Sequence, residues 1–89
     1  YYNPEANEIV FPAAILQPPF FNASWPAAMN FGSIGMVMGH EIGHSTDNEG
    51  SQFDATGALN DWWDPLSWQK FVNRTKCVAD LYSSFQVPG

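Results

Sequence analysis

The five residues from His40 to His44 read His-Glu-Ile-Gly-His, and they constrain the structure of this chain more than any other stretch. Two imidazoles four residues apart lie one turn apart on the same face of an α-helix. So placed, both can bind one tetrahedral metal ion, and the Glu41 carboxylate can reach a water molecule bound to it. The pattern therefore predicts a helix over this stretch and favours metal-assisted hydrolysis as the reaction class.

A five-residue pattern can also arise by chance, and a single histidine in a helix is more often packed or solvated than bound to a metal. His40 and His44 are, however, the only histidines among the 89 residues, and they stand at ligand spacing. Apolar residues precede them and turn-forming residues follow, as in a helix that lines an active site. We therefore interpret both histidines as metal ligands and Glu41 as the catalytic base.

Zinc is the metal that this donor set favours, because neutral imidazole suits it and hydrolytic sites use a redox-inert Lewis acid. Catalytic zinc usually keeps three protein ligands and one position for water. We expect one zinc ion, with a third ligand, a carboxylate or a histidine, that comes from another segment. Bound zinc lowers the pKa of its water toward about 7, and Glu41 would take that proton and pass it to the leaving amine.

Three neighbours of the array could serve the same site. Asp47 follows His44 by three residues. If the helix continues that far, its carboxylate can accept the other ring N–H of His44 and fix the orientation of the imidazole. The alternative is a solvated carboxylate at a helix C-terminus, where negative charge is unfavourable. Met36 and Val37, one turn before His40, form either a pocket for a hydrophobic substrate side chain or ordinary core.

The remaining pattern predicts a mainly α-helical fold with a short β-strand. The run Ile9-Val10-Phe11 favours a strand that stops at Pro12. Asp64 and Pro65 form a good helix start, with Asp64 as the N-cap and Pro65 in the first position. The expected order within one partial domain at 1–89 is a strand and loop at 1–26, the zinc-binding helix at about 27–46, a loop at 47–63, and a second helix at about 64–86.

Composition indicates that the chain is a piece of a larger domain. It is 45% hydrophobic and 16% aromatic, which is more apolar surface than 89 residues can bury alone. A net charge of -6 with three basic residues gives no footprint for nucleic acid. No apolar run approaches the length of a membrane span, so membrane anchoring is expected only through segments outside this chain.

Cys77 is the one cysteine of the chain. It is either a buried thiol or half of a disulfide whose partner lies elsewhere. The N-x-S/T sequons at Asn22 and Asn73 are candidate glycosylation sites. Together, the sequons and the unpaired cysteine favour a secretory, oxidising compartment over the cytosol.

A long ordered set of residues resembles one family. The run from Glu8 to Phe21 is similar to the segment that precedes the zinc helix in neprilysin and the endothelin-converting enzymes. The resemblance covers essentially the whole chain and continues through Gly39–His44, Gln52-Phe53-Asp54, Gly57, Asp61-Trp62-Trp63 and Lys76-Cys77. It implies a fragment of a thermolysin-like (zincin) catalytic domain, in a zinc endopeptidase or oligopeptidase that acts on peptides.

The resemblance also implies roles for individual residues. His40 and His44 match the family's ligands, Glu41 its base, and Asp47 the aspartate that supports a ligand. Cys77 matches a cysteine that pairs with one far away in the chain. Members are typically single-pass membrane proteins with an extracellular catalytic part, and some are secreted. Four residues fall where the family lines its main pocket for the residue after the scissile bond: Ile15, Phe20, Met36 and Val37.

The family's glutamate ligand lies in a downstream E-x-x-x-D helix beyond Gly89, and its transition-state-stabilising histidine and substrate-clamping arginine lie further on. Ala14, Thr46 and Ala58 depart from residues that are common in the family. None of these departures touches a ligand or the base. A catalytically silent member, or an incomplete fragment used as a binding module, is the alternative. A closed structural zinc site is disfavoured because such sites are rich in cysteine.

Overall fold

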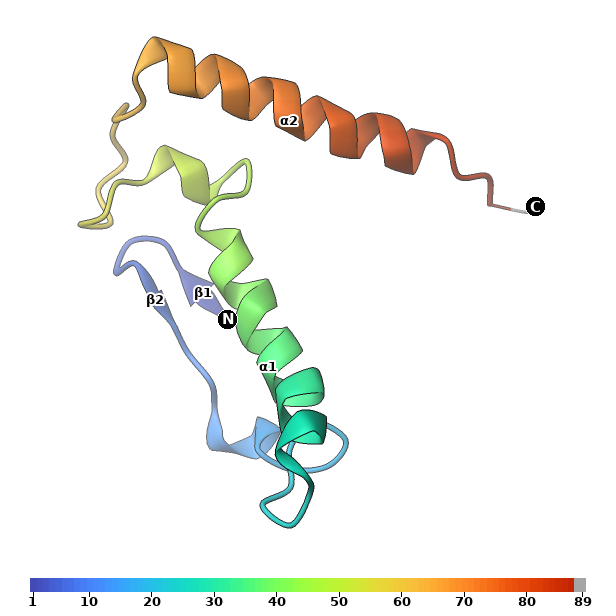
Figure 1. Cartoon of the computed structure of the whole chain (residues 1–89). Helices are drawn as coiled ribbons and strands as arrows, with labels where there is room; N and C mark the ends of the chain where they lie inside the picture. The colour runs from blue at the N-terminus through green and yellow to red at the C-terminus, as the bar shows by residue number, and fades with distance from the viewer. Residues whose placement is uncertain (88–89) are drawn as a thin grey trace.

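In the computed structural model, which describes residues 1–87, two long helices and one short hairpin form an open, bent arrangement (Figure 1). This confirms the expected fold class, mainly helical with little strand. The order is β1 (Tyr2–Asn3), β2 (Glu8–Ile9), the 3-10 turn η1 (Ala13–Ile15), α1 (Ala27–His44), the 3-10 turn η2 (Gly50–Gln52) and α2 (Pro65–Ser83).

The strand expected at Ile9-Val10-Phe11 lies slightly earlier, at β2. It pairs with β1, a strand that the sequence did not predict. The two run antiparallel, and Tyr2 lies opposite Ile9. Pro4 follows β1 directly, so the stretch is too short for the alternation of apolar and polar residues that would indicate a strand. The hairpin lies alongside α1, and both strands contact that helix (Figure 1).

Helix α1 ends at His44, two residues before the expected end at about 46. The Ser45 N–H bonds to the Ile42 carbonyl at 3.1 Å, and the Thr46 N–H bonds to the Gly43 carbonyl at 3.1 Å. Each of these bonds spans three residues instead of four and so tightens the last turn, as is common at helix ends. The hydroxyls of Ser45 and Thr46 donate to the same two carbonyls. Such side-chain bonds compete with continuation of the helix.

The loop between α1 and α2 is held by one carboxylate and one glycine. Asp54 accepts hydrogen bonds from the Thr56 hydroxyl and N–H, the Ala58 N–H and the Asn60 amide. These bonds, with that of the Thr56 hydroxyl foremost, lower the pKa of Asp54 to about 2. Gly57 has φ +82°, and a Cβ there would meet the backbone of Glu5. The loop is thus pressed against the hairpin.

Helix α2 starts where the sequence predicts and ends earlier than the sequence predicts. The Asp64 carboxylate accepts the N–H groups of Leu66 and Ser67 at 3.0 Å each, and Pro65 occupies the first turn. The helix ends at Ser83 rather than near residue 86. The Ser84 hydroxyl donates to the Leu81 carbonyl, so this side chain competes for a backbone acceptor.

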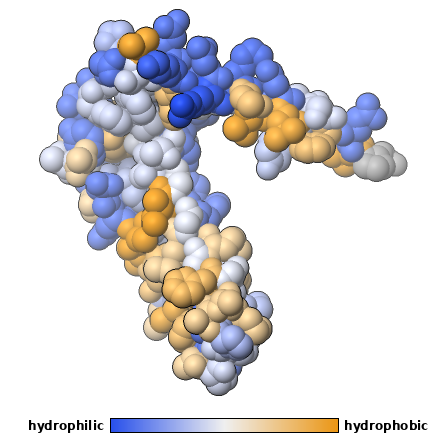
Figure 2. All heavy atoms as spheres, viewed as in Figure 1, coloured by the Kyte–Doolittle hydropathy of each residue, from blue (hydrophilic) through white to orange (hydrophobic). Residues whose placement is uncertain are grey.

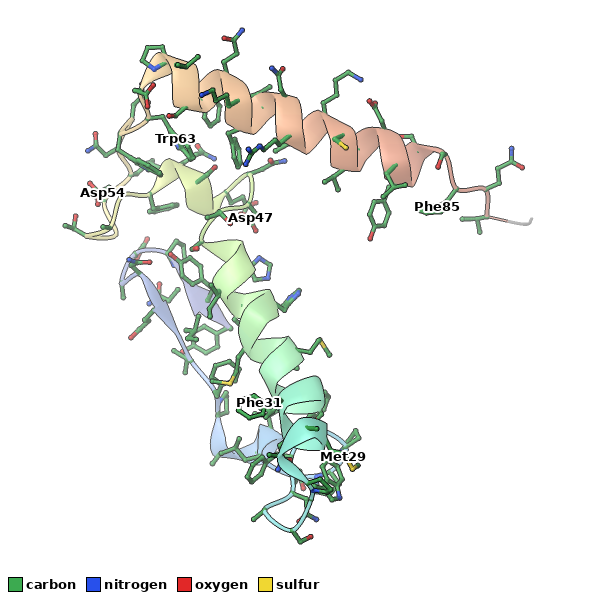
Figure 3. All side chains as sticks on the ribbon, viewed as in Figure 1. Met29, Phe31, Asp47, Asp54, Trp63 and Phe85 are labelled. Atoms are coloured by element: carbon green, nitrogen blue, oxygen red, sulfur yellow. The ribbon has the colours of Figure 1, made fainter. Side chains whose placement is uncertain are left out.

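The described residues form no hydrophobic core. No hydrophobic side chain in residues 1–87 is buried, and Ser51 is the one fully buried polar residue. Apolar side chains gather on the surface around α1 and along α2 (Figure 2), and the side chains of α2 project into open space (Figure 3). None of the helices in residues 1–87 combines the length and apolarity that a membrane span needs.

Candidate metal centre

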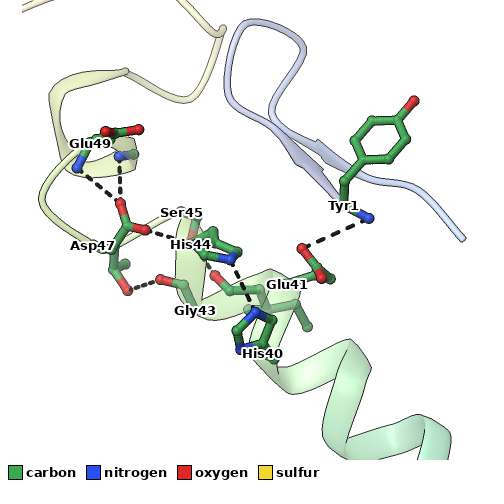
Figure 4. A network of polar contacts seen from close by, with 11 residues as sticks. Tyr1, His40, Glu41, Gly43, His44, Ser45, Asp47 and Glu49 are labelled. Carbon is green, nitrogen blue, oxygen red and sulfur yellow. Dashed lines mark hydrogen bonds and ion pairs between the residues drawn. The ribbon is translucent and has the colours of Figure 1, made fainter.

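The last turn of α1 brings the two histidine rings together (Figure 4). Their Nε2 atoms lie 3.2 Å apart, and the rings meet edge to face with centroids 4.7 Å apart. Zinc–nitrogen bonds of about 2.0–2.1 Å at a tetrahedral angle place two ligand nitrogens roughly 3.3 Å apart. His40 and His44 therefore present two nitrogens at the spacing that a single zinc ion requires.

Glu41 lies beside this pair. One of its carboxylate oxygens falls within 4.8 Å of the ligand nitrogens of His40 and His44. The side chain is 14% exposed, and its Oε2 lies 3.8 Å from the amino nitrogen of Tyr1 at the start of the hairpin. Among residues 1–87, no group donates a hydrogen bond to this carboxylate, so both of its oxygens can accept a proton or a water.

Asp47 reaches His44 from the loop rather than from the helix. Its Oδ2 lies 2.7 Å from the His44 Nδ1, and its Oδ1 accepts the N–H groups of Glu49 and Gly50 at 2.9 and 2.8 Å (Figure 4). An ionised carboxylate accepts hydrogen bonds only, so the proton of neutral His44 resides on Nδ1. The lone pair is then on Nε2, which faces His40.

The contact between Asp47 and His44 shifts the pKa of both side chains. The hydrogen bond to Asp47 raises the pKa of His44 above 6.5, and the hydrogen bond from His44 lowers the pKa of Asp47 below 3.8. The two side chains are 44% and 43% exposed, so water screens their attraction. The contact therefore matters for the orientation of the ring more than for stability.

The four expected pocket residues are less closely gathered. Ile15 ends η1 and is half-buried, Phe20 follows in the loop, and Met36 and Val37 lie on α1 one turn before His40. Met36 is 60% exposed and Phe20 is 37% exposed. None of the four lines either of the two cavities described below. Their role as a pocket stays a prediction.

The two cavities lie on either side of η2. The smaller, of about 220 Å³, is lined by His44, Asp47, Gly50 and the hairpin. The larger, of about 770 Å³, is lined by Asn48, by residues from η2 to the first turn of α2, including Trp63, and by none of the histidines. The smaller cavity therefore borders the candidate metal centre.

The candidate modification sites are all at the surface. Asn22 is half-buried in a turn, where its Oδ1 accepts the Ser24 hydroxyl at 2.7 Å. Asn73 is exposed on α2. Cys77 is also exposed on α2 and forms no disulfide within residues 1–87, and both alternatives for it, a buried thiol or a disulfide with a distant cysteine, stay predictions.

Sequence reasoning missed the contribution of η2. The N–H of Gly50, which follows α1 in a turn-rich stretch, is one of the donors that hold Asp47. The Trp63 indole N–H donates to the Ser51 carbonyl at 2.8 Å. The second bond spans 12 positions in sequence, and no local pattern indicates it.

Comparison with known families gives one consistent result. A family model described as Peptidase family M13 matches residues 1–89. Neprilysin-11 of Caenorhabditis elegans is 49% identical over 88 residues, which are 99% of this chain and 10% of that protein. Human endothelin-converting enzyme 1 is 48% identical over 89 residues, which are 100% of this chain and 12% of that protein. The chain thus spans about a tenth of each relative.

Solved structures agree with the sequence matches. The zinc metalloprotease ZMP1 of Mycobacterium tuberculosis, solved with an inhibitor, superposes with a TM-score of 0.91 at 50% identity, over 98% of this chain and 13% of that one. PepO from Lactobacillus rhamnosis superposes with a TM-score of 0.80 at 47% identity, over 84% of this chain and 12% of that one.

Proposed function

Because this chain belongs to peptidase family M13, we propose that it forms the metal-binding part of a zinc endopeptidase or oligopeptidase that hydrolyses bonds within peptides. The family match confirms the resemblance to neprilysin and the endothelin-converting enzymes. The observation that carries the proposal is the 3.2 Å separation of two Nε2 atoms at the end of one helix, with a carboxylate 2.7 Å from the far nitrogen of His44.

His40 and His44 would hold the metal, together with a third ligand from a segment outside this chain. Zinc bound there would act as a Lewis acid and would lower the pKa of a coordinated water toward about 7. The matched spacing of the nitrogens, the neutral tautomer of His44 and the absence of a soft thiolate from the set all suit zinc. One ion is expected.

Glu41 would act as the general base. Its carboxylate lies close to the ligand nitrogens, is largely shielded from solvent and is free of hydrogen-bond donors in residues 1–87. It can therefore take the proton that the attacking water loses and deliver it to the amine nitrogen of the cleaved bond. Ile15, Phe20, Met36 and Val37 are proposed to line the pocket for the substrate residue after that bond.

The zinc content and the cleavage pattern of the full-length protein test this function. We expect about one zinc ion per chain by elemental analysis, because a catalytic site of this type holds a single ion. We also expect cleavage at internal bonds of an unstructured peptide, detected by mass spectrometry. A purified protein that holds no zinc, or that holds it and leaves a broad peptide library intact, would contradict the proposal.

Asp47→Ala in the full-length protein should weaken zinc binding by about 10–100-fold, the usual cost of losing a carboxylate that orients a metal-bound histidine. The cause is the loss of the acceptor 2.7 Å from the His44 Nδ1. Competition with a chromophoric chelator measures the dissociation constant. Asp54→Ala is the matched control, because Asp54 also holds its own loop but contacts no histidine. Equal affinities of the Asp47 variant and the wild type would exclude the orienting role.

We further propose an extracellular or cell-surface location, with peptides as substrates. The exposed thiol of Cys77 supports a disulfide with a cysteine outside this chain, and the exposed Asn73 and the half-buried Asn22 are the proposed glycosylation sites. An anchor in the membrane, where one exists, would come from segments outside residues 1–89. Peptide mapping of the secreted or surface protein, with and without reduction and deglycosylation, tests these three sites.

A further inference from the structure

We propose that Trp63 and Gly50 are positioning residues for the metal centre, acting on His44 through the turn η2 and the carboxylate of Asp47. The proposal rests on the zinc-binding function proposed above. It adds two residues that contact neither the ring nitrogens of His40 and His44 nor the carboxylate of Glu41. Each step follows from a contact in the described residues.

The first step is the set of backbone hydrogen bonds by which η2 and the residue before it fix Asp47. The Asp47 Oδ1 accepts two backbone N–H groups, from Glu49 at 2.9 Å and from Gly50 at 2.8 Å. The Asp47 carbonyl accepts the Ser51 N–H at 3.0 Å. Three backbone donors therefore fix this residue, and its remaining oxygen Oδ2 points to His44. The direction of the imidazole depends on where η2 lies.

The second step is the close approach that Gly50 permits. Gly50 is one of two buried residues in the described part of the chain. A Cβ on it would collide with the carbonyl oxygen of His44 and would lie 2.9 Å from the His44 carbonyl carbon. These neighbours are backbone atoms, so they cannot move aside without shifting the second candidate ligand itself. Only glycine lets the turn come near enough for its N–H to reach Asp47.

The third step is the anchor of η2. The Trp63 indole N–H donates to the Ser51 carbonyl at 2.8 Å, and Ser51 is fully buried. The Trp63 ring packs against the first turns of α2, with ring centroids 5.9 Å from Trp68 and 5.2 Å from Phe71. The Trp63 indole thereby links the start of α2 to η2. Figure 3 labels Trp63 and Asp47, which both lie near η2.

The test uses the full-length protein and measures two quantities for each variant, the zinc dissociation constant and the melting temperature of the metal-free form. Trp63→Phe keeps a large aromatic ring and removes the N–H that Ser51 accepts. We expect zinc to bind about tenfold more weakly, the lower end of the range for residues that support a ligand. Trp62→Phe is the matched control, since the Trp62 indole has no hydrogen-bond partner in residues 1–87 and stacks on Trp63.

A double-mutant cycle separates this route from a general loss of stability. If Trp63 acts through Asp47, then Trp63→Phe should weaken zinc binding in the wild type and should add little in the Asp47→Ala background. An equal loss in both backgrounds would overturn the proposal, as would an unchanged dissociation constant in the single variant. A wild type that binds no zinc would instead contradict the proposed function, so the two failures are distinguishable.

Gly50→Ala is the second variant. It is measured together with Trp63→Phe, and it replaces Trp63→Phe if the Trp63→Phe protein does not fold. Gly57→Ala is its control, because a Cβ at Gly57 also meets backbone, that of Glu5, but lies outside the contacts that hold Asp47. We expect Gly50→Ala to weaken zinc binding at least tenfold more than Gly57→Ala does. Equal dissociation constants for these two variants would count against the role of η2.

Discussion

Glu41→Gln in the full-length protein is expected to abolish measurable peptide hydrolysis, with a loss in kcat of about 10²–10⁴-fold, the usual contribution of a positioned general base. Glutamine keeps the size and the polarity of the side chain but cannot take a proton. The carboxylate is well placed to do so, since it is 14% exposed and receives no hydrogen bond in residues 1–87. Steady-state kinetics on a fluorogenic peptide give kcat and KM.

Zinc content decides how this result is interpreted. Because the proposed ligand nitrogens belong to His40 and His44, we expect the Glu41→Gln protein to keep nearly the wild-type amount of zinc. Full activity in the variant would remove Glu41 from the role of base. Loss of zinc together with activity would assign Glu41 to the coordination of the metal instead. A wild-type protein that binds zinc but cleaves nothing would support the catalytically silent alternative.

The 89-residue chain expressed alone is expected to show no cooperative thermal transition and to bind zinc weakly. The reason is the lack of a buried hydrophobic side chain anywhere in residues 1–87. Burial of apolar area is the main favourable contribution to folding, and each large side chain left in water forgoes about 1.5–3 kcal/mol of it. A site with two protein ligands also falls short of the three that catalytic zinc usually has.

Near-ultraviolet circular dichroism during heating and titration with zinc would check this expectation. The full catalytic domain is the control, and it should melt sharply and hold zinc through purification. A sharp transition in the isolated chain would show that the contacts among α1, η2 and α2 suffice for folding. Chelator-sensitive peptidase activity of the isolated chain would show that no third ligand from another segment is needed.

The local parts of the structure could be predicted from the sequence because their signals are local. The spacing of His40 and His44 predicts their shared face, and Asp64 with Pro65 predicts the start of α2. The approach of Asp47 to His44 was also foreseen, although for a different reason: the carboxylate comes from a turn and not from a continued helix. The hydroxyls of Ser45 and Thr46 stop the helix first.

Contacts between distant residues were not predictable in the same way. The bond from Trp63 to Ser51 and the fit of Gly50 beneath His44 depend on how the loop folds back, which no periodicity reveals. The pocket formed by Ile15, Phe20, Met36 and Val37 came from family resemblance and stays a prediction. These four side chains line neither of the two cavities described above, so no local contact pattern indicates the pocket.

One carboxylate of this protein serves two purposes that are usually separate. Asp47 accepts the N–H groups that open η2, and it accepts the ring N–H of His44. Under the role proposed for Asp47, a change in the position of η2 also changes the affinity for the metal, so neither evolution nor design can adjust the two independently. A substitution that continues α1 through Ser45 and Thr46 would change the direction in which the chain leaves the helix, and with it the position of Asp47 relative to His44. A designer who wishes to stiffen the end of α1 would need to rebuild the support of His44 in the same step.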